Sequence, residues 1–474
     1  MRLYLINPSN PLVDSANLQA SRWNRYRVWK PLGLLVVAAL TPPEWEITII
    51  DENLGPRDYA AMPRPDLVGL TAFTSQAPRA YELAAEFRRR GVKVVMGGIH
   101  ATMCPQEALG YVDAVVSGEA ETVWARVLDD ARGGTLQKIY PGEHADMSQV
   151  PPARHDLLSS GYAFGSVQTT RGCPLDCSFC SVSAFNGKRY RYRPIEHVVQ
   201  EMQSIREKWV LVVDDNLIGT SPTHGARAKE LFRAMIRARL RKRWVGQVTI
   251  NMADDEELLS LAAEAGCMGV FIGFESPTPE GLAEVGKKFN THKGRDLARS
   301  VRRIQRHGIM VVGAFILGLD VDEPGIGRRV AHAAQSYGVD ALSATFLTPL
   351  PGTRLWEAME AAGRIGARGF PGDWRYYTFN FPTARYRHFS WAQLCAEMKA
   401  CECHFYSLGQ VLRRAVRSLL QWRRPVFSLV ANLSYRNNAR LNHRVLDALR
   451  DMAAAAVPAP PAPGGTGPEC QTSP

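Results

Sequence analysis

The sequence lacks any long uninterrupted hydrophobic run, which bears on where the protein works. The apolar stretch "PLGLLVVAAL" at residues 31–40 is far shorter than the roughly 20 residues that a membrane-spanning helix needs. The first residues, "MRLYLINPSN", also lack the charged region followed by a long apolar region that marks a secretory signal. We therefore expect a cytoplasmic protein.

A disulfide framework is also missing. The chain has nine cysteines, an odd number, and only three of them stand close together. Small secreted proteins that depend on disulfides have an even number of cysteines spread along a short chain. The cysteine pattern therefore favours a reducing cytosol.

Familiar catalytic and cofactor motifs are absent as well. No G-x-G-x-x-G motif follows the first predicted strand, so a dinucleotide is not indicated, and no Ser-His-Asp or paired-carboxylate arrangement stands out. The composition, with 46% hydrophobic residues in 474, suits a globular protein of two or three domains. The net charge of +11 favours anionic ligands, anionic lipid or nucleic acid without choosing among them.

Short apolar runs alternate with helical patterns in the first part of the chain. The runs at 3–7, 46–51, 67–72, 92–98 and 113–118 are typical of buried parallel strands. This alternation predicts a Rossmann-like, doubly wound α/β domain over residues 1–140. Its ligand is expected outside the carboxyl ends of the strands.

The alternation restarts after a polar, proline-bearing connection at 141–165. Six further strands are predicted at 166–170, 209–216, 244–250, 268–276, 309–318 and 341–349. They indicate a partial (β/α)6 barrel of the TIM type over residues 166–355, with functional loops at the carboxyl ends of its strands. A mainly helical extension at 356–450 and a disordered Ala/Pro/Gly tail at 451–474 complete the predicted organisation.

The stretch "QTTRGCPLDCSFC" at 168–180 carries Cys173, Cys177 and Cys180 directly after the first barrel strand. A structural zinc site needs four closed ligands, which this stretch does not supply. Three thiolates suit a four-iron cluster that leaves one iron open to a non-protein ligand. Gly172 relieves steric limits at the loop entrance, and Pro174 stiffens the turn.

This C-x3-C-x2-C motif on a partial barrel resembles the radical S-adenosylmethionine (SAM) enzymes, and Phe179 before the last cysteine also fits their pattern. The resemblance implies a [4Fe-4S] cluster whose open iron chelates the amino and carboxylate groups of SAM. An electron from the cluster would cleave SAM to a 5′-deoxyadenosyl radical. The three cysteines are thus the predicted cluster ligands and catalytic residues.

Further SAM contacts are implied at successive strand ends. They are Phe179, Asp214, Asp215, Asn216, Gln247, Glu275, Gly313 and Gly318. For the carboxylates, the alternative of capping the next helix stays open. For the two glycines, the implied role is a close approach of backbone to adenosine.

The segments "RPDLVGLTAFTSQAPRAYELA", "VVMGGIHAT" and "AVVSGEAET" resemble the cobalamin-binding (B12-binding) domain that precedes the barrel in one branch of these enzymes. The implied cobalamin contacts are Thr71, Thr74, Ser75, Gly97, Gly98, Ser117, Gly118 and Glu119. The chain departs from histidine-ligating cobalamin domains because "DENLG" puts Asn53 at the histidine position. His100 is interpreted as a core or helix-start hydrogen-bonding residue instead of a cobalt ligand.

Together the two resemblances imply a cobalamin-dependent radical SAM methyltransferase. It would methylate an unactivated carbon of a hydrophobic lipid, pigment or secondary metabolite through a 5′-deoxyadenosyl radical and methylcobalamin. The alternative is a radical SAM/B12 enzyme that catalyses a non-methylating cyclisation, rearrangement or oxidation. The implied partners are a small-molecule or lipid substrate and an electron donor such as flavodoxin or ferredoxin.

Two other interpretations are disfavoured. A tRNA methylthiolating enzyme would carry three more N-terminal cysteines, whereas only Cys104 precedes Cys173, so no nucleic acid is expected. A non-catalytic cofactor sensor has no need for an open iron. The basic, aromatic segment 405–436 is interpreted as a helix packed on the barrel, with peripheral membrane contact as the alternative.

Overall fold

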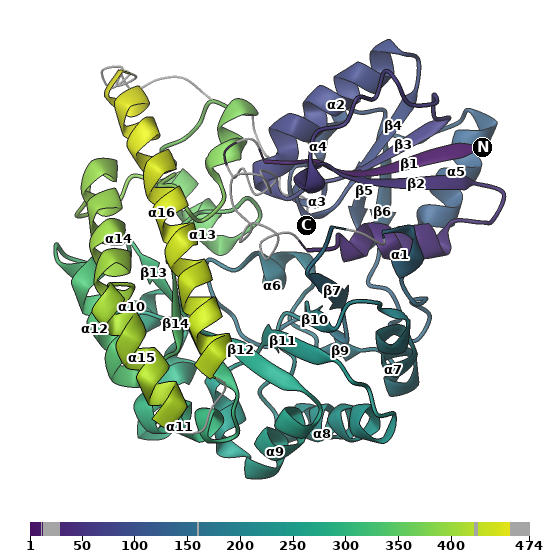
Figure 1. The fold of residues 1–474 in the computed structure, drawn as a ribbon. Coiled ribbons are helices and arrows are strands. Elements are labelled where there is room, and N and C mark those ends of the chain that lie inside the picture. The colour runs from purple at the N-terminus through teal and green to yellow at the C-terminus, as the bar shows by residue number, and fades with distance from the viewer. Residues whose placement is uncertain (11, 13–28, 159–160, 421–424, 456–474) are drawn as a thin grey trace.

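The computed structural model describes residues 1–10, 12, 29–158, 161–420 and 425–455, and it contains two parallel β-sheets surrounded by helices (Figure 1). One sheet is built from the first part of the chain and the other from the middle part. The mixed α/β class and the helical C-terminal part are as predicted. No helix in these described ranges is long and apolar enough to span a membrane.

The first sheet has six parallel strands in the order β2-β1-β3-β4-β5-β6. Their bounds are β1 Arg2–Asn7, β2 Glu46–Asp51, β3 Leu67–Thr71, β4 Lys93–Gly97, β5 Ala114–Gly118 and β6 Ile139–Gly142. The order reverses between β1 and β3, which places a crevice for ligands at the carboxyl ends of these two strands. Five of the strands match the predicted runs.

Helices cover both faces of this sheet, which makes it doubly wound. They are α1 Leu32–Leu40, α2 Ala77–Arg89, α3 Ile99–Met103, α4 Pro105–Leu109 and α5 Trp124–Gly133. Leu35 of α1 and Trp124 of α5 share one core cluster, whereas Tyr81 and Phe87 of α2 belong to another. The predicted connection also contributes to the first cluster through Met147 and Val150, so it packs on the domain.

The second sheet has six parallel strands in the order β14-β13-β12-β11-β10-β7. Their bounds are β7 Phe164–Val167, β10 Trp209–Val212, β11 Arg243–Gln247, β12 Cys267–Glu275, β13 Met310–Leu317 and β14 Ala341–Phe346. Each strand of this sheet pairs with the next strand of the sheet along the chain. Between β7 and β10, the short strands β8 (Thr170–Arg171) and β9 (Arg191–Tyr192) form a separate two-stranded ribbon. The sheet is a barrel of six strands left open between β7 and β14, as predicted.

Helices follow the barrel strands in turn. They are α6 Ser181–Phe185, α7 Ile195–Ser204, α8 Pro222–Arg237, α9 Glu256–Glu264, α10 Pro279–Glu284, α11 Leu297–Arg306, α12 Ile326–Tyr337 and α13 Arg354–Ala361. The largest core cluster lies between these helices and the strands, and it includes Phe232 and Trp244, whose rings stack at 5.4 Å.

The C-terminal part is helical, with α14 Trp391–Phe405, α15 Leu408–Leu420 and α16 Pro425–Ala455. These helices lie along one side of the barrel (Figure 1). Ahead of them, the 3-10 turn Gly372–Tyr376 brings Trp374 into the core of the first domain. The first residues of the predicted tail end α16, and the remainder of that tail, 456–474, lies outside the described residues.

Candidate functional site

The three-cysteine loop leaves the barrel at the carboxyl end of β7, between the β8–β9 ribbon and α6. Gly172 at its entrance has a φ of +87°, and a Cβ there would lie 2.2 Å from the carbonyl oxygen of Arg189. Only glycine fits such a position without strain. The Gly172 N–H also donates to Asp215 Oδ2 at 2.8 Å, which fixes the start of the loop.

Cys177 is buried, and Cys173 and Cys180 are partly buried. Burial raises the pKa of all three thiols, and the charge of Lys287 lowers the pKa of each. For Cys177, where the charges of Cys180, Glu275 and Cys173 act with burial, the pKa reaches about 12. Within the described residues, no group of three or more His, Cys, Asp or Glu side chains is arranged to hold a metal ion. A loop that supplies three thiolates suits a four-iron cluster with one open iron better than a structural zinc site, which needs four closed ligands.

Segments far away in the sequence hold this loop in place. Ser178 donates its N–H to the carbonyl of Val285 at 3.3 Å, and its own carbonyl accepts from Leu355 N at 3.0 Å. Arg354 Nη2 donates to the Asp176 carbonyl at 2.7 Å. The loop is therefore pinned by the residues after α10 and by the start of α13.

A buried ion pair lies beside the thiols and was not found from the sequence. Lys287 Nζ donates to Glu275 Oε1 at 3.0 Å, and both residues are buried. Burial lowers the pKa of Lys287, but the charges of Glu275 and Cys177 outweigh it and raise the pKa overall. A Cβ on Gly273 would lie 2.1 Å from Glu275 Oε1, so this glycine makes room for the pair.

Glu275 itself ends β12 with a φ of +63°, a conformation that a non-glycine residue seldom adopts. Such strain persists where the surrounding structure enforces it, often at functional sites. The sequence pointed to Glu275 by its place at a strand end. It gave no signal for Lys287, because "GKKFN" is also typical of an exposed lysine pair.

Two of the predicted SAM contacts that follow β10 accept hydrogen bonds from residues that lead into the three-cysteine loop. Asp214 accepts hydrogen bonds from the Thr169 N–H at 2.6 Å and from the Thr169 hydroxyl, and burial raises its pKa to about 6. Asp215 accepts from Gly172 and from Asn186 Nδ2. Asn216 Oδ1 is buried without a hydrogen-bond partner next to Cys173, which leaves it able to accept from a bound group.

The remaining predicted SAM contacts lie in different surroundings. Gln247 is exposed at the carboxyl end of β11, and Phe179 packs partly buried against the barrel core. A Cβ on Gly313 would lie 3.1 Å from Val339, and one on Gly318 would lie 2.8 Å from Tyr386. Side chains therefore lie in the direction of a Cβ at both glycines, and the approach of adenosine to their backbone stays a prediction.

The predicted cobalamin contacts all lie at the carboxyl edge of the first sheet or in the loops that follow it. They are Thr71 and Gly97 at strand ends, Thr74 and Ser75 in the next 3-10 turn, Gly98 before α3, and Ser117, Gly118 and Glu119 at the end of β5. A Cβ on Gly97 would meet nothing closer than 3.7 Å. By contrast, one on Gly118 would lie 2.1 Å from the Gly142 carbonyl oxygen, so that glycine serves strand packing.

Asn53, at the position of the missing histidine, and His100 both have structural partners. Asn53 donates from Nδ2 to Asp51 Oδ1 at 2.8 Å, within its own turn. His100 is fully buried, with Nε2 3.0 Å from the Tyr81 hydroxyl and 3.3 Å from Glu107 Oε1. His100 therefore has the core hydrogen bonds expected of it.

Glu119, one of the predicted cobalamin contacts, links the two domains. Its carboxylate accepts from Arg171 Nη1 at 2.9 Å, from Arg191 Nη1 at 3.0 Å and from the Ala145 N–H at 2.8 Å. Although burial raises its pKa, the Arg191 and Arg171 guanidinium groups hold the pKa of Glu119 below its usual value. Arg171 immediately precedes Gly172. The Glu119 carboxylate therefore connects the first domain to the start of the three-cysteine loop.

Replacing Glu119 with glutamine is expected to lower the free energy of unfolding by about 2 kcal/mol, because two buried arginines lose a charged acceptor. Urea denaturation under anaerobic conditions measures the change. Glu46→Gln is the matched control, since the Glu46–Arg2 pair is exposed and should cost less than about 1 kcal/mol. Equal losses in the two variants would contradict the linking role of Glu119.

The carboxyl ends of the two sheets meet at this interface. Helix α3, after β4, packs against α6 of the cluster loop. A Cβ on Gly352, in the loop after β14, would lie 2.3 Å from Met103 Sδ of α3. A group held at the edge of the first sheet and a group held by the three thiols would therefore face each other.

Comparison with known proteins matches both parts of the chain to family models. The Radical SAM superfamily model matches residues 167–324, and the B12 binding domain model matches residues 23–128. Bacteriochlorophyllide d C-12(1)-methyltransferase from Chlorobaculum tepidum is 30% identical over 74% of this chain and 77% of its own length. Hopanoid C-2 methylase from Rhodopseudomonas palustris is 28% identical over 71% of this chain and 65% of its own length.

A solved structure has the same architecture. The radical S-adenosylmethionine methyltransferase TsrM from Kitasatospora setae, with cobalamin and a [4Fe-4S] cluster bound, aligns with a TM-score of 0.65. The alignment covers 93% of this chain and 99% of that one at 20% identity. At this identity the likeness shows a shared fold.

Proposed function

Because the chain belongs to the radical SAM enzymes that carry a B12-binding domain, we propose that it methylates an unactivated carbon of a hydrophobic small molecule. Its cofactors are a [4Fe-4S] cluster, SAM and cobalamin. The observation that carries the proposal is the meeting of the two carboxyl edges, one with three convergent thiols and the other with the B12-binding crevice.

When bound, the cluster and SAM supply a radical that abstracts hydrogen from carbon, and cobalamin supplies the methyl transfer. Cys173, Cys177 and Cys180 would hold the cluster. Asn216 Oδ1 is available to accept a hydrogen bond from SAM. The exposed side-chain amide of Gln247 is available to accept or to donate one. The role of the chain is to fix the distance between the cofactors and to keep water out.

The Lys287–Glu275 pair contributes a fixed charge arrangement. Lys287 Nζ is a buried cation close to the thiols, and Glu275 keeps it in place from the end of β12. A buried cation stabilises negative charge nearby, both on thiolate ligands and on a carboxylate of SAM. We therefore include Lys287 among the residues that hold the cofactors.

The substrate class is proposed to be a pigment, a lipid or a secondary metabolite. The support is that one relative is named for a bacteriochlorophyllide and another for a hopanoid. A one-electron donor such as flavodoxin or ferredoxin would reduce the cluster. The enzyme would work in the cytoplasm and touch the membrane surface peripherally.

The test is an anaerobic assay of the reconstituted enzyme with a reductant, SAM carrying a trideuterated methyl group, and extracts of pigments and lipids. A product that gains a trideuteromethyl group, with both S-adenosylhomocysteine and 5′-deoxyadenosine formed, is the expected result. Formation of 5′-deoxyadenosine with an altered but unlabelled product would instead establish a cyclisation, rearrangement or oxidation. A Cys177→Ala enzyme provides the background.

A further inference from the structure

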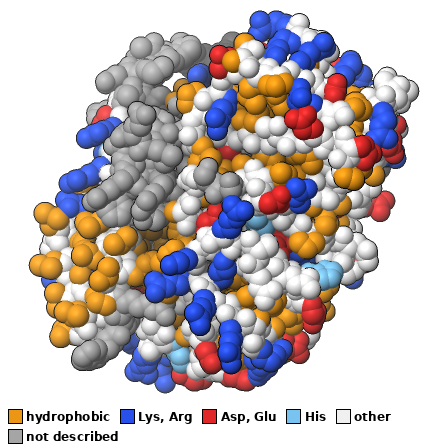
Figure 2. Space-filling view, turned by 45° about the vertical axis from the view of Figure 1, so that its right-hand side comes forward, with side chains coloured by type: hydrophobic (Ala, Val, Ile, Leu, Met, Phe, Trp, Pro, Cys, Tyr) orange, Lys and Arg blue, Asp and Glu red, His pale blue; other side chains and the backbone are white. Residues whose placement is uncertain are grey.

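Helix α15 carries a row of exposed apolar side chains. Leu408, Leu412, Val416 and Leu419 follow one another at intervals of three or four residues, so they share one helical face. Leu412 is 64% exposed and Leu419 61%. Figure 2 shows hydrophobic side chains gathered at its lower left, the side on which Figure 1 has α15. Helix α15 packs on its own protein through Val411 and Ser418, as expected, but it also presents this apolar row to solvent.

Apolar side chains are also exposed at the last residue of α15 and near the start of α16. Leu420 is 74% exposed, and so is Val426 at the start of α16. The opposite side of α15 presents Val411 and Ser418, which are buried. A helix with one face docked on its own protein and a second, apolar face in contact with water is unusual for a soluble monomer, and such a patch marks an interaction site.

Positive charge is abundant on α15 and on helix α11, which lies at the same end of the barrel. The sequence from 403 to 446 contains no Asp or Glu, whereas Arg413 and Arg417 lie beside the apolar residues of α15. Helix α11 adds four arginines, Arg299, Arg302, Arg303 and Arg306, which line a surface hollow of about 330 Å³. Three of these are exposed, and Arg303 lies 3.4 Å from Glu256.

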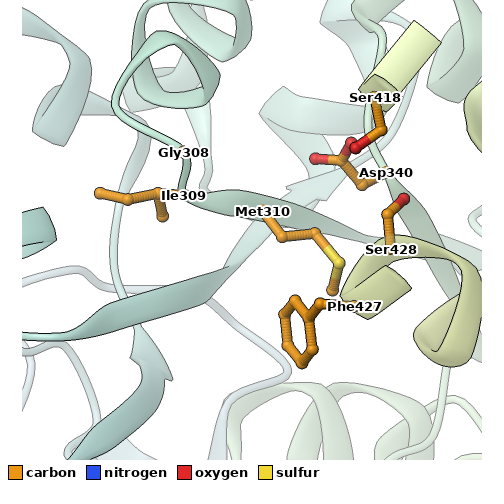
Figure 3. Close-up of a pocket in the computed structure, with 7 residues that line it drawn as sticks. All are labelled: Gly308, Ile309, Met310, Asp340, Ser418, Phe427 and Ser428. Atoms are coloured by element: carbon orange, nitrogen blue, oxygen red, sulfur yellow. The ribbon is translucent and has the colours of Figure 1, made fainter. Parts of the chain in front are cut away.

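Helix α11 and the α15–α16 hairpin lie at the same end of the barrel. A small cavity is lined by Gly308 and Ile309, just after α11, and by Ser418 of α15 with Phe427 and Ser428 of α16 (Figure 3). Phe427 also stacks on Trp209, the first residue of β10, at 5.1 Å. This end is therefore the amino end of the strands, opposite to the thiols.

We propose that the exposed face of α15, rimmed by the arginines of α11 and α15, docks on an anionic lipid bilayer. The leucines enter the boundary between headgroups and acyl chains, and the guanidinium groups bind lipid phosphates. A second copy of the chain fits this face less well, because two surfaces in which arginines outnumber acidic side chains would bring like charges together.

This inference names the surface that makes the membrane contact included in the proposed function. It rests on the proposed function for its biological purpose only. Docking at the amino end leaves the cofactor end of the barrel turned away from the lipid. The contact therefore tethers the enzyme near a membrane without blocking an electron donor or the B12-binding domain.

The experiment is flotation of the full-length reconstituted enzyme with vesicles of phosphatidylcholine, alone or mixed with phosphatidylglycerol. We expect binding to the anionic vesicles, weakened by salt. Arg302→Gln combined with Arg306→Gln should lower the binding constant about 30-fold. Leu412→Ser combined with Leu419→Ser should also weaken binding, and this loss should persist at high salt.

Arg88→Gln with Arg89→Gln, at the end of α2 in the first domain, is the matched charge control and should bind as the parent does. Reductive cleavage of SAM in solution should be unchanged in all variants, which separates this test from that of the proposed function. Equal binding of parent and α11 or α15 variants overturns the inference. So does a vesicle-independent dimer that the leucine variants dissociate, which would assign the face to a second copy.

Discussion

Replacing Cys177 with alanine is expected to reduce both the iron content and the reductive cleavage of SAM to background. Cys177 is 7% exposed and lies between the other two thiols in the loop, so no other described side chain can replace its sulfur there. Loss of one of three ligands leaves the cluster with two thiolates, too few to hold it stably. Iron analysis should fall from about four per chain to near zero, and 5′-deoxyadenosine should no longer form.

The control for this prediction is Cys401→Ala in α14. Cys401 is equally buried, at 0% exposure, but it lies within a helix remote from the loop. This variant should keep its iron and its cleavage activity. A Cys177→Ala enzyme that still carried the cluster and cleaved SAM would refute the assignment of the loop.

The second large effect is expected from Lys287→Met, which leaves Glu275 buried without a partner. Removing one member of a buried ion pair costs about 3–5 kcal/mol, because the remaining charge is desolvated and unpaired. Urea denaturation of the anaerobic protein should show this loss of stability. Equilibrium dialysis with SAM should show weaker binding, because the buried cation near the cysteines that would hold the cluster is missing.

Two controls separate the pair from a general effect of removing charge. The double variant Lys287→Met with Glu275→Gln should recover most of the lost stability, since no unpaired charge remains. Lys93→Met, which breaks the exposed pair with Asp113, should change stability by less than about 1 kcal/mol. If Lys287→Met were as stable as Lys93→Met, the buried pair would not support the site.

Strand positions could be predicted where apolar runs were long. All six barrel strands were predicted, because each has at least three apolar or small residues between turn signals. Strand β6 was missed, because "IYPG" is short and contains Pro141, a residue that usually argues against a strand. The β8–β9 ribbon was missed because two residues carry no periodicity.

The site was predictable only in part. The cysteine spacing within one loop is a local signal, and so is the placement of Asp214 and Glu275 at strand ends. Their partners were not predictable: Asp214 binds Thr169, and Glu119 binds Arg171 and Arg191. The assignment of Gly313 and Gly318 to adenosine stays a prediction, because a glycine indicates that space is restricted but not which group restricts it.

The sequence by itself determined the chemistry of the loop and the parallel architecture, since both follow from spacings of a few residues. Only the tertiary structure decided that Lys287 lies near the thiols and that Glu119 of the first domain binds arginines of the barrel domain. It also decided that the leucines of α15 face outward. The reason is physical. Local patterns set which elements form, whereas side-chain partners depend on which distant elements pack together, and no single stretch of sequence records that.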